Sequence, residues 1–455
     1  SNSVDLLFSS IVPVPKCVLN INIEEVESAR NFTLDSSAER WWDQTDLTRL
    51  IIANNCLNSL PEDIRLIHAL NLLDVHDNNL ESLPDTLGDL IELQKLVLSR
   101  NKLTTLPDTI QQLQNLTVLQ IDNNNMTNLP DGIGQLSNLE DLNASNNSLV
   151  TLPPNLGKLT KVRNLNLSSN QLTTIPAEVG NMSQMRNSVH ELHLGFNYIT
   201  ELSKEHLAPL GQITLMDLRD NKLKEIPAEI TLLANLQRLD LTNNSLQGLP
   251  NEVGLMVNLR NLQFDGNPIR NIRRDIIMVG RIIFFFITFY IFFEKKQKNK
   301  IVFKLIESLS ELHMGFNKLT CLPADIGKMV HLTYLDVRNN CMTDLPEEIS
   351  QLKNLREIKF STIPPVIYTL SKLEILFING NKLTEVDVDS LQKLPILTTL
   401  NLQNNNLTQI PPELALCPKL ACLQLEGNAL RNPRAAIIAK GSSAILDYLR
   451  DRIIK

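Results

Sequence analysis

The stretch VLSRNKLTTLPDTIQQLQNL, residues Val97–Leu116, decides the fold of this 455-residue chain, because versions of it recur along most of the sequence. From Asn55 to Asn170 its asparagine returns at a step of 23 residues, and the series continues less evenly to Asn428. A period of about 20–50 residues indicates one array of stacked units rather than unrelated domains. The recurring asparagines are Asn55, Asn78, Asn101, Asn124, Asn147, Asn170, Asn197, Asn221, Asn244, Asn267, Asn317, Asn340, Asn381, Asn405 and Asn428.

Proline supports the same register. Eleven of the 22 prolines stand six residues after a recurring asparagine, and each follows Leu or Ile. Proline fixes φ and lacks an N–H, which suits the opening of a short helix. These prolines are Pro61, Pro84, Pro107, Pro130, Pro153, Pro176, Pro227, Pro250, Pro323, Pro346 and Pro411.

The leucines predict how each repeat folds. Alternation around Leu96 and Leu98 predicts a short strand with one buried side. Leu106, Ile110 and Leu113 share one side of a helical or 3₁₀ turn. One repeat cannot bury these side chains alone, but stacked neighbours can. We expect an α/β solenoid with a curved parallel sheet on its concave side and helical turns on its convex side.

Each recurring asparagine is predicted to turn inward where its strand ends. There its amide would satisfy backbone groups of its own and the adjacent coil that are otherwise buried unpaired. We therefore interpret the whole asparagine series as structural, and we expect Asn101→Ala to cost about 1–3 kcal/mol.

The pattern L-x-x-L-x-L-x-x-N-x-L resembles the leucine-rich repeat family, over about residues 23–279 and 305–455. It is similar more widely to the intracellular Ras-suppressor-like scaffolds of that family. The resemblance implies a protein that binds partner proteins and has no catalysis of its own.

Two internal similarities predict two arrays. ELHLGFNYIT (Glu191–Thr200) is nearly repeated as ELHMGFNKLT (Glu311–Thr320), and Gly266–Gly280 parallels Gly427–Gly441. We expect a flank and cap at residues 1–46, a first array at 47–278, an anomalous insert at 279–304, a second array at 305–430 and a cap helix at 431–455. Ser442 or Ser443 would cap that helix, whose apolar side is formed by Ile445, Leu446, Leu449 and Ile453.

The insert contains the run IIFFFITFYIFF, Ile282–Phe293. Seven of the 14 phenylalanines lie between Phe284 and Phe303, and the codons of this composition are A/T-rich. Our leading hypothesis is translated non-coding sequence, such as a retained intron. A membrane anchor is the alternative, although 12 residues fall short of the ~20 that a spanning helix needs.

The spacing is irregular at two further places. Asn170 to Asn197 is 27 residues, and Asn340 to Asn381 is 41, five short of two repeats. Because the second stretch lacks an asparagine turn, we expect a local dislocation near Ser361.

Composition and charge limit the class of protein. A net charge of −7 argues against nucleic acid as the main partner. The six cysteines are scattered, which favours free thiols in the cytoplasm, with the nucleus as a further location. Because the chain begins at Ser1, we expect a fragment or a chain that has lost its start.

No enzyme motif is found. HELH, at His190–His193, has the wrong spacing for a helical zinc site, and the glycines of DGIGQL (Asp131–Leu136) belong to a predicted convex turn. Gly327-Lys328 lacks the preceding glycines of a phosphate loop. We therefore expect no catalytic residues, no cofactor and no metal.

The outward positions of the strands are the candidate partner-binding face. They lie six, four and two residues before each asparagine and form a polar surface with an acidic bias. Such a surface suits protein recognition and predicts a scaffold or adaptor with a role in intracellular signal transduction. A membrane-tethered adaptor that uses residues 282–293 is the alternative. The candidates are Asp74, His76, Lys95, Gln120, Asp122, Asp141, Asn143, Asp217, Arg219, Arg238, Asp240, Tyr334, Asp336 and Arg338.

Overall fold

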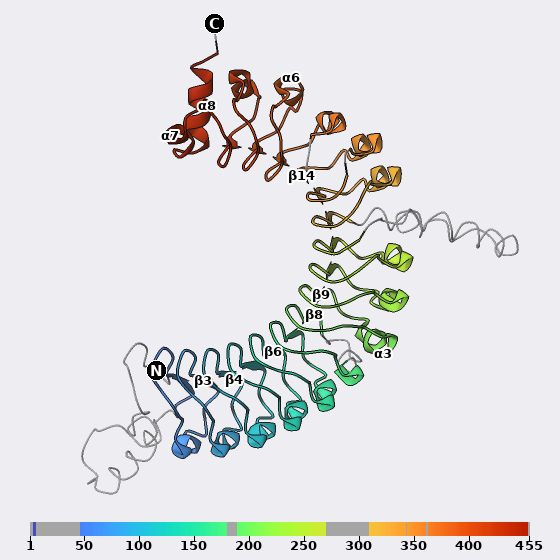
Figure 1. Ribbon diagram of the computed structural model, residues 1–455. Coiled ribbons are helices and arrows are strands. Elements are labelled where there is room, and N and C mark those ends of the chain that lie inside the picture. Colours follow the sequence, from blue (N-terminus) through green and yellow to red (C-terminus); the bar gives the residue numbers. More distant parts are fainter. Residues whose placement is uncertain are drawn as a thin grey trace, which may run out of the picture. The chain divides into compact units, whose positions relative to one another are not determined.

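The computed structural model describes residues 3–5, 46–179, 189–269, 309–342, 344–360 and 363–453. Contacts divide the chain into two compact units, residues 1–222 and 223–455. In each unit, parallel strands line the concave side and short helices line the convex side (Figure 1). The predicted insert, with its run Ile282–Phe293, lies outside the described residues.

In the first unit, the strands pair in parallel in chain order from β1 to β9. The strands are β1 Ser3–Asp5, β2 Arg49–Ile51, β3 Leu72–Asp74, β4 Lys95–Val97, β5 Val118–Gln120, β6 Asp141–Asn143, β7 Asn164–Asn166, β8 Glu191–His193 and β9 Leu215–Asp217. The helices are η2 Glu62–Leu66, η3 Asp85–Asp89, η4 Asp108–Gln112, η5 Asp131–Gln135, η6 Pro154–Lys158, α3 Lys204–Leu207 and η8 Ala208–Leu210.

In the second unit, the strands run in parallel order from β10 to β17. The strands are β10 Arg238–Asp240, β11 Asn261–Gln263, β12 Glu311–His313, β13 Tyr334–Asp336, β14 Glu357–Lys359, β15 Ile375–Phe377, β16 Thr399–Asn401 and β17 Cys422–Gln424. The helices are η9 Ala228–Leu232, η10 Asn251–Leu255, η11 Ala324–Lys328, η12 Glu347–Gln351, η13 Pro365–Thr369, α6 Val388–Leu391, η14 Pro412–Leu416, α7 Ala435–Ile438 and α8 Ser442–Arg450.

A continuous leucine core explains why repeats stack. The central residues of successive strands pair with one another, as Leu73 does with Leu96 and Leu96 with Leu119, and all three are fully buried. Pro107, with φ −66° and ψ 148°, precedes η4, which buries Ile110 against the same core. Each repeat thus covers the apolar side of its neighbour.

Helix α8 covers the C-terminal end of the second unit. Its Ile445, Leu446 and Leu449 are buried against η14 and β17, whereas Ile453 is only half-buried. The prediction that Ser442 or Ser443 caps this helix is wrong, because the residue before the helix is Gly441, with φ 88°. The Ser442 hydroxyl instead accepts from the Leu423 N–H and donates to the Leu423 carbonyl, both at 3.0 Å. It therefore satisfies backbone groups of the last strand.

The sheet continues through the two places of irregular spacing. β7 pairs with β8, and β14 pairs with both β13 and β15, so the described strands show no slip. The repeat that contains β14 is shorter than its neighbours in the connection between β14 and η13. The dislocation expected near Ser361 lies outside the described residues. Strand register survives because each strand is held by its own three-residue ladder.

Candidate functional site

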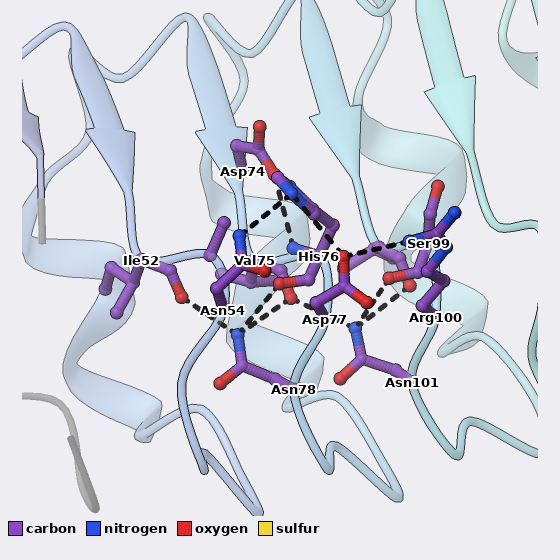
Figure 2. A network of polar contacts seen from close by, with 12 residues as sticks. Ile52, Asn54, Asp74, Val75, His76, Asp77, Asn78, Ser99, Arg100 and Asn101 are labelled. Atoms are coloured by element: carbon purple, nitrogen blue, oxygen red, sulfur yellow. Dashed lines mark hydrogen bonds and ion pairs between the residues drawn. The ribbon is translucent and has the colours of Figure 1, made fainter. Parts of the chain in front are cut away.

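The asparagines fix the backbone beneath the candidate face, as Figure 2 shows for Asn78 and Asn101. The Asn101 side-chain amide donates to the carbonyls of Val75 and Leu98, each at 3.0 Å. Its Oδ1 accepts from the Leu80 N–H at 3.0 Å. One side chain thus satisfies three backbone groups in two successive coils, which holds the strands rigidly at one spacing.

All fifteen asparagines of the series donate to a backbone carbonyl. Asn147, Asn340, Asn381 and Asn428 are half-buried, and the others are buried. The residue before each asparagine has a φ between 51° and 72°, the left-handed region. This turn sends the chain away from the sheet at the same point of every repeat.

The structure places the predicted face residues on or directly after the strands, in three degrees of exposure. Arg219 and Arg238 are exposed, while Asp217 and Asp336 are buried, with exposed fractions of 7% and 2%. The remaining candidates are half-buried: Asp74, His76, Lys95, Gln120, Asp122, Asp141, Asn143, Asp240, Tyr334 and Arg338.

Asp217 and Asp336 are therefore buried, unlike the other members of the candidate face. Each accepts the backbone N–H of the residue two positions later, from Arg219 at 3.1 Å and from Arg338 at 3.2 Å. Short acidic and amide side chains commonly form such local turns. The same bond is made by Asp74, Asn143, Asn166, Asp240 and Asn401.

The first unit carries a cluster of aromatic and charged side chains across β8 and β9. This Phe196 cluster consists of Glu191, His193, Phe196, Asp217 and Arg219. Arg219 Nε lies 3.2 Å from Asp217 Oδ2, and its guanidinium carbon lies 5.4 Å from the centroid of the Phe196 ring. His193 Nε2 lies 3.5 Å from Glu191 Oε2, and Nδ1 lies 3.9 Å from Asp217 Oδ2. The Asp217 carboxylate raises the pKa of His193 above its usual value, and Glu191 raises it further.

The second unit repeats this arrangement across β12 and β13. The corresponding Phe316 cluster consists of Glu311, His313, Phe316, Asp336 and Arg338. Arg338 Nε lies 3.1 Å from Asp336 Oδ2, and its guanidinium carbon lies 5.3 Å from the Phe316 ring centroid. Here burial lowers the pKa of His313 and raises that of Asp336. The two clusters share one geometry in different electrostatic surroundings.

The second unit adds an aromatic row beside its cluster. His313 stacks on Tyr334, with ring centroids 4.3 Å apart. Lys359 Nζ lies 4.9 Å from the Tyr334 centroid and 5.1 Å from that of Phe377. Burial raises the pKa of Tyr334, so its hydroxyl stays protonated. The contacts of the Lys359 ammonium with both rings hold these three side chains together on the face.

Our selection of face residues from the sequence omitted Phe196, Phe316 and both histidines of the clusters. His193 and His313 stand four residues before an asparagine of the series, at outward positions, whereas Phe196 and Phe316 directly precede that asparagine and lie outside those positions. The near-identical stretches ELHLGFN and ELHMGFN were the signal that could have identified them, since no other asparagine of the series follows Gly-Phe.

A half-buried carboxylate beside the Phe316 cluster makes stability depend on pH. Burial, followed by the charge of Asp336, raises the pKa of Asp265 to about 7. Its Oδ1 accepts the Gly315 N–H. The unfolded side chain ionises near pH 4. Between about pH 4 and 7 the folded state therefore binds more protons, and the free energy of unfolding falls as pH rises.

We expect Asp265→Asn to remove most of this pH dependence while keeping an acceptor for Gly315. At pH 8 the variant should be more stable than the wild type by on the order of 1–3 kcal/mol. Urea denaturation at pH 5 and pH 8 measures the difference, with the exposed Asp131→Asn as control. Equal pH slopes for Asp265→Asn and wild type would contradict the assignment.

The described residues contain no cluster of histidine, cysteine or acidic side chains arranged to hold a metal ion. Five cysteines lie in these ranges as free thiols: Cys56, Cys321, Cys341, Cys417 and Cys422. Among the helices of the described ranges, none has the length and apolar character for a membrane span.

Family models match several parts of the chain. A leucine-rich repeat region model matches residues 85–194, a leucine rich repeat model matches 187–246 and 371–430, and a third such model matches 331–352. A solved leucine-rich repeat protein of Leptospira interrogans is 32% identical, covering 88% of this chain and 95% of that one, with a TM-score of 0.69. The chain belongs to the leucine-rich repeat family.

The chain is also similar to a solved receptor and to short parts of two longer curated proteins. The plant peptide hormone receptor RGFR1, solved in complex with RGF2, is 25% identical over 84% of this chain and 67% of that one, with a TM-score of 0.54. The adenylate cyclase of Schizosaccharomyces pombe is 34% identical over 141 residues, 29% of this chain and 8% of the cyclase. Probable inactive serine/threonine-protein kinase roco10 of Dictyostelium discoideum is 31% identical over 113 residues, 23% of this chain and 4% of that protein. The matched segments thus span less than a tenth of these two curated relatives.

Proposed function

We propose that this protein is a non-catalytic scaffold that binds partner proteins on the concave strand face. Leucine-rich repeat domains typically serve protein–protein interaction. The observation that carries the proposal is the combination of a backbone fixed by the asparagine series with half-buried polar side chains along successive strands. A preorganised surface loses little conformational entropy on binding, so contacts made there translate into affinity.

A role in intracellular signal transduction is the finer form of this proposal. It is supported by the sequence of the flank, Ser36–Leu57, and of the closing stretch, Gly427–Ile453, which resemble leucine-rich repeat-containing protein 40. We further propose the two-array organisation, residues 47–278 and 305–430, and a cytoplasmic location. The membrane-tethered alternative depends on residues 282–293, which lie outside the described residues.

Asp122 and Asp141 provide the test, because they lie on and beside adjacent strands near the middle of the first unit's face. Asp122 Oδ1 accepts from the Ser99 hydroxyl at 2.6 Å, and Asp141 Oδ1 accepts from the Asn164 amide at 3.3 Å. Both are half-buried, so their reversal changes the charge of the face without reaching the leucine core.

We expect the double substitution Asp122→Lys with Asp141→Lys to abolish capture of proteins that the wild type retains from a cell lysate. The matched control, Glu92→Lys with Asp131→Lys, reverses two exposed charges on the convex side and should retain them. Quantitative mass spectrometry of the captured proteins, with thermal melts to verify folding, measures both. A partner set unchanged in the face variant, or lost equally in the control, would contradict the proposed binding face.

A further inference from the structure

Phe196 and Phe316 have a backbone conformation that bulky side chains rarely adopt. Their φ angles are 56° and 51°. At this place the other repeats carry Asn, Asp, Ser, Arg or Gly, residues that are small, polar or long and flexible. The two phenylalanines are also 48% and 53% exposed, so core packing does not compensate for the strain. Strain kept at an exposed position points to a role outside the fold.

The arginine beside each phenylalanine is held in advance in one position. In the Phe196 cluster, Asp217 accepts the backbone N–H of Arg219 with one oxygen and lies 3.2 Å from Arg219 Nε with the other. Asp336 holds Arg338 in the same way in the Phe316 cluster, at 3.2 Å and 3.1 Å. Each guanidinium also lies over the neighbouring phenylalanine ring. Since arginine has five N–H donors, donors remain for a ligand.

A glycine in each cluster gives the aspartate–arginine pair its place. A Cβ atom at Gly195 would lie 3.1 Å from Asp217 Oδ1 and 3.0 Å from Arg219 Cγ. At Gly315 it would lie 3.1 Å from Asp336 Oδ1. The glycine of each Gly-Phe sequence therefore leaves room for the aspartate–arginine pair of the next repeat. The phenylalanine ring packs against the guanidinium of that pair.

We propose that the Phe196 cluster and the Phe316 cluster are two docking sites of the same kind, for partner-protein segments in which an Asp or Glu side chain stands next to an apolar side chain. The carboxylate would pair with the held guanidinium, and the apolar side chain would pack on the phenylalanine. Charge complementarity favours this occupant, because a planar, fixed guanidinium matches a carboxylate. The glutamates of the two clusters, Glu191 and Glu311, lie instead against His193 and His313, at 3.5 Å and 3.7 Å. This inference rests on the proposed function and names its partner chemistry.

The test is a selection of phage-displayed random twelve-residue peptides on the full chain, followed by fluorescence anisotropy with the best synthetic peptide. We expect an acidic residue beside an apolar one and two binding sites per chain. Arg219→Gln should leave one site, and Arg219→Gln with Arg338→Gln should weaken binding about tenfold or more at both. Arg100→Gln is the control, because this exposed arginine directly precedes an asparagine of the series and its guanidinium pairs with Asp77, at 3.5 Å.

A second pair of variants separates docking from folding. Phe196→Asn and Phe316→Asn place at each site the residue commonest there in the other repeats. Because asparagine tolerates the left-handed conformation, thermal stability should be kept or raised while peptide binding is lost. A purely structural phenylalanine would give the opposite result, a lower melting temperature with unchanged binding.

The remaining outcomes are decisive as well. Peptides without an acidic residue, or peptides that bind the double arginine variant as tightly as the wild type, would overturn the inference. If the peptide tests failed in this way while Asp122→Lys with Asp141→Lys still abolished capture of proteins from the lysate, the proposed function would stand. Failure to select any peptide would overturn the paired sites and leave the scaffold function to the lysate experiment.

Discussion

The double substitution Ile445→Ala with Leu449→Ala is expected to lower the free energy of unfolding of the second unit by about 4 kcal/mol or more. Both side chains are fully buried under helix α8, with exposed fractions of 0% and 1%. Removing a buried Ile or Leu side chain costs about 2–5 kcal/mol at each site, through lost burial and the cavity left behind. Beneath them lie β17 and η14, which have no further repeat on that side among the described residues.

Guanidinium denaturation of the full chain measures this effect. The control is Asp447→Ala on the same helix, whose side chain is 64% exposed and which should change stability by less than about 0.5 kcal/mol. A loss confined to fraying of α8, with an unchanged main transition, would show that the helix does not support the array. Undocking should also expose the leucines under the helix, which increased binding of a hydrophobic dye would report.

Asn101→Ala is expected to cost about 3 kcal/mol, the second-largest effect. The substitution removes three hydrogen bonds near 3.0 Å and leaves the buried Leu80 N–H without this acceptor. The Val75 and Leu98 carbonyls each lose one of two amide donors and keep those of Asn78 and Asn124. A buried donor left unsatisfied costs about 1–3 kcal/mol, and the weaker satisfaction of the two carbonyls adds to that cost. The effect should spread to the preceding repeat, because two of these groups belong to it.

The matched control is Asn115→Ala, which lies in the same repeat but on the convex side. Asn115 is exposed, and its amide donates one hydrogen bond to the Ile91 carbonyl, at 3.1 Å. We expect a loss of about 0.5–1 kcal/mol there, because water replaces the lost partner. Urea denaturation of the two variants gives the comparison. Equal losses would mean that burial of the asparagine amide contributes nothing particular to the fold.

The repeating unit was predictable because its physical causes are local. A leucine at most strand centres, an asparagine at the turn and a proline before most of the helices act within about one period, and each recurs often enough to be recognised. The same logic failed for Ser442, whose hydroxyl bonds to Leu423 rather than to its own helix. A serine before a helix is an ordinary cap, and only the neighbouring strand edge offered it other partners.

The candidate site was predictable only as a set of outward positions. Sequence spacing placed Asp217, Arg219, Asp336 and Arg338 on one face, but it did not show that the aspartates are buried and hold the arginines. It also left Phe196 and Phe316 out, because they follow the strand in a turn where a polar residue is usual.

The sequence by itself thus determined the stacked repeat, its inward leucines and its inward asparagines, since each depends on spacing within one period. Tertiary structure alone decided which outward side chains act together. Side chains from successive repeats meet about one strand spacing apart although they lie some two dozen residues apart in the chain, and their burial, ion pairs and ring contacts arise only when one coil is laid on the next.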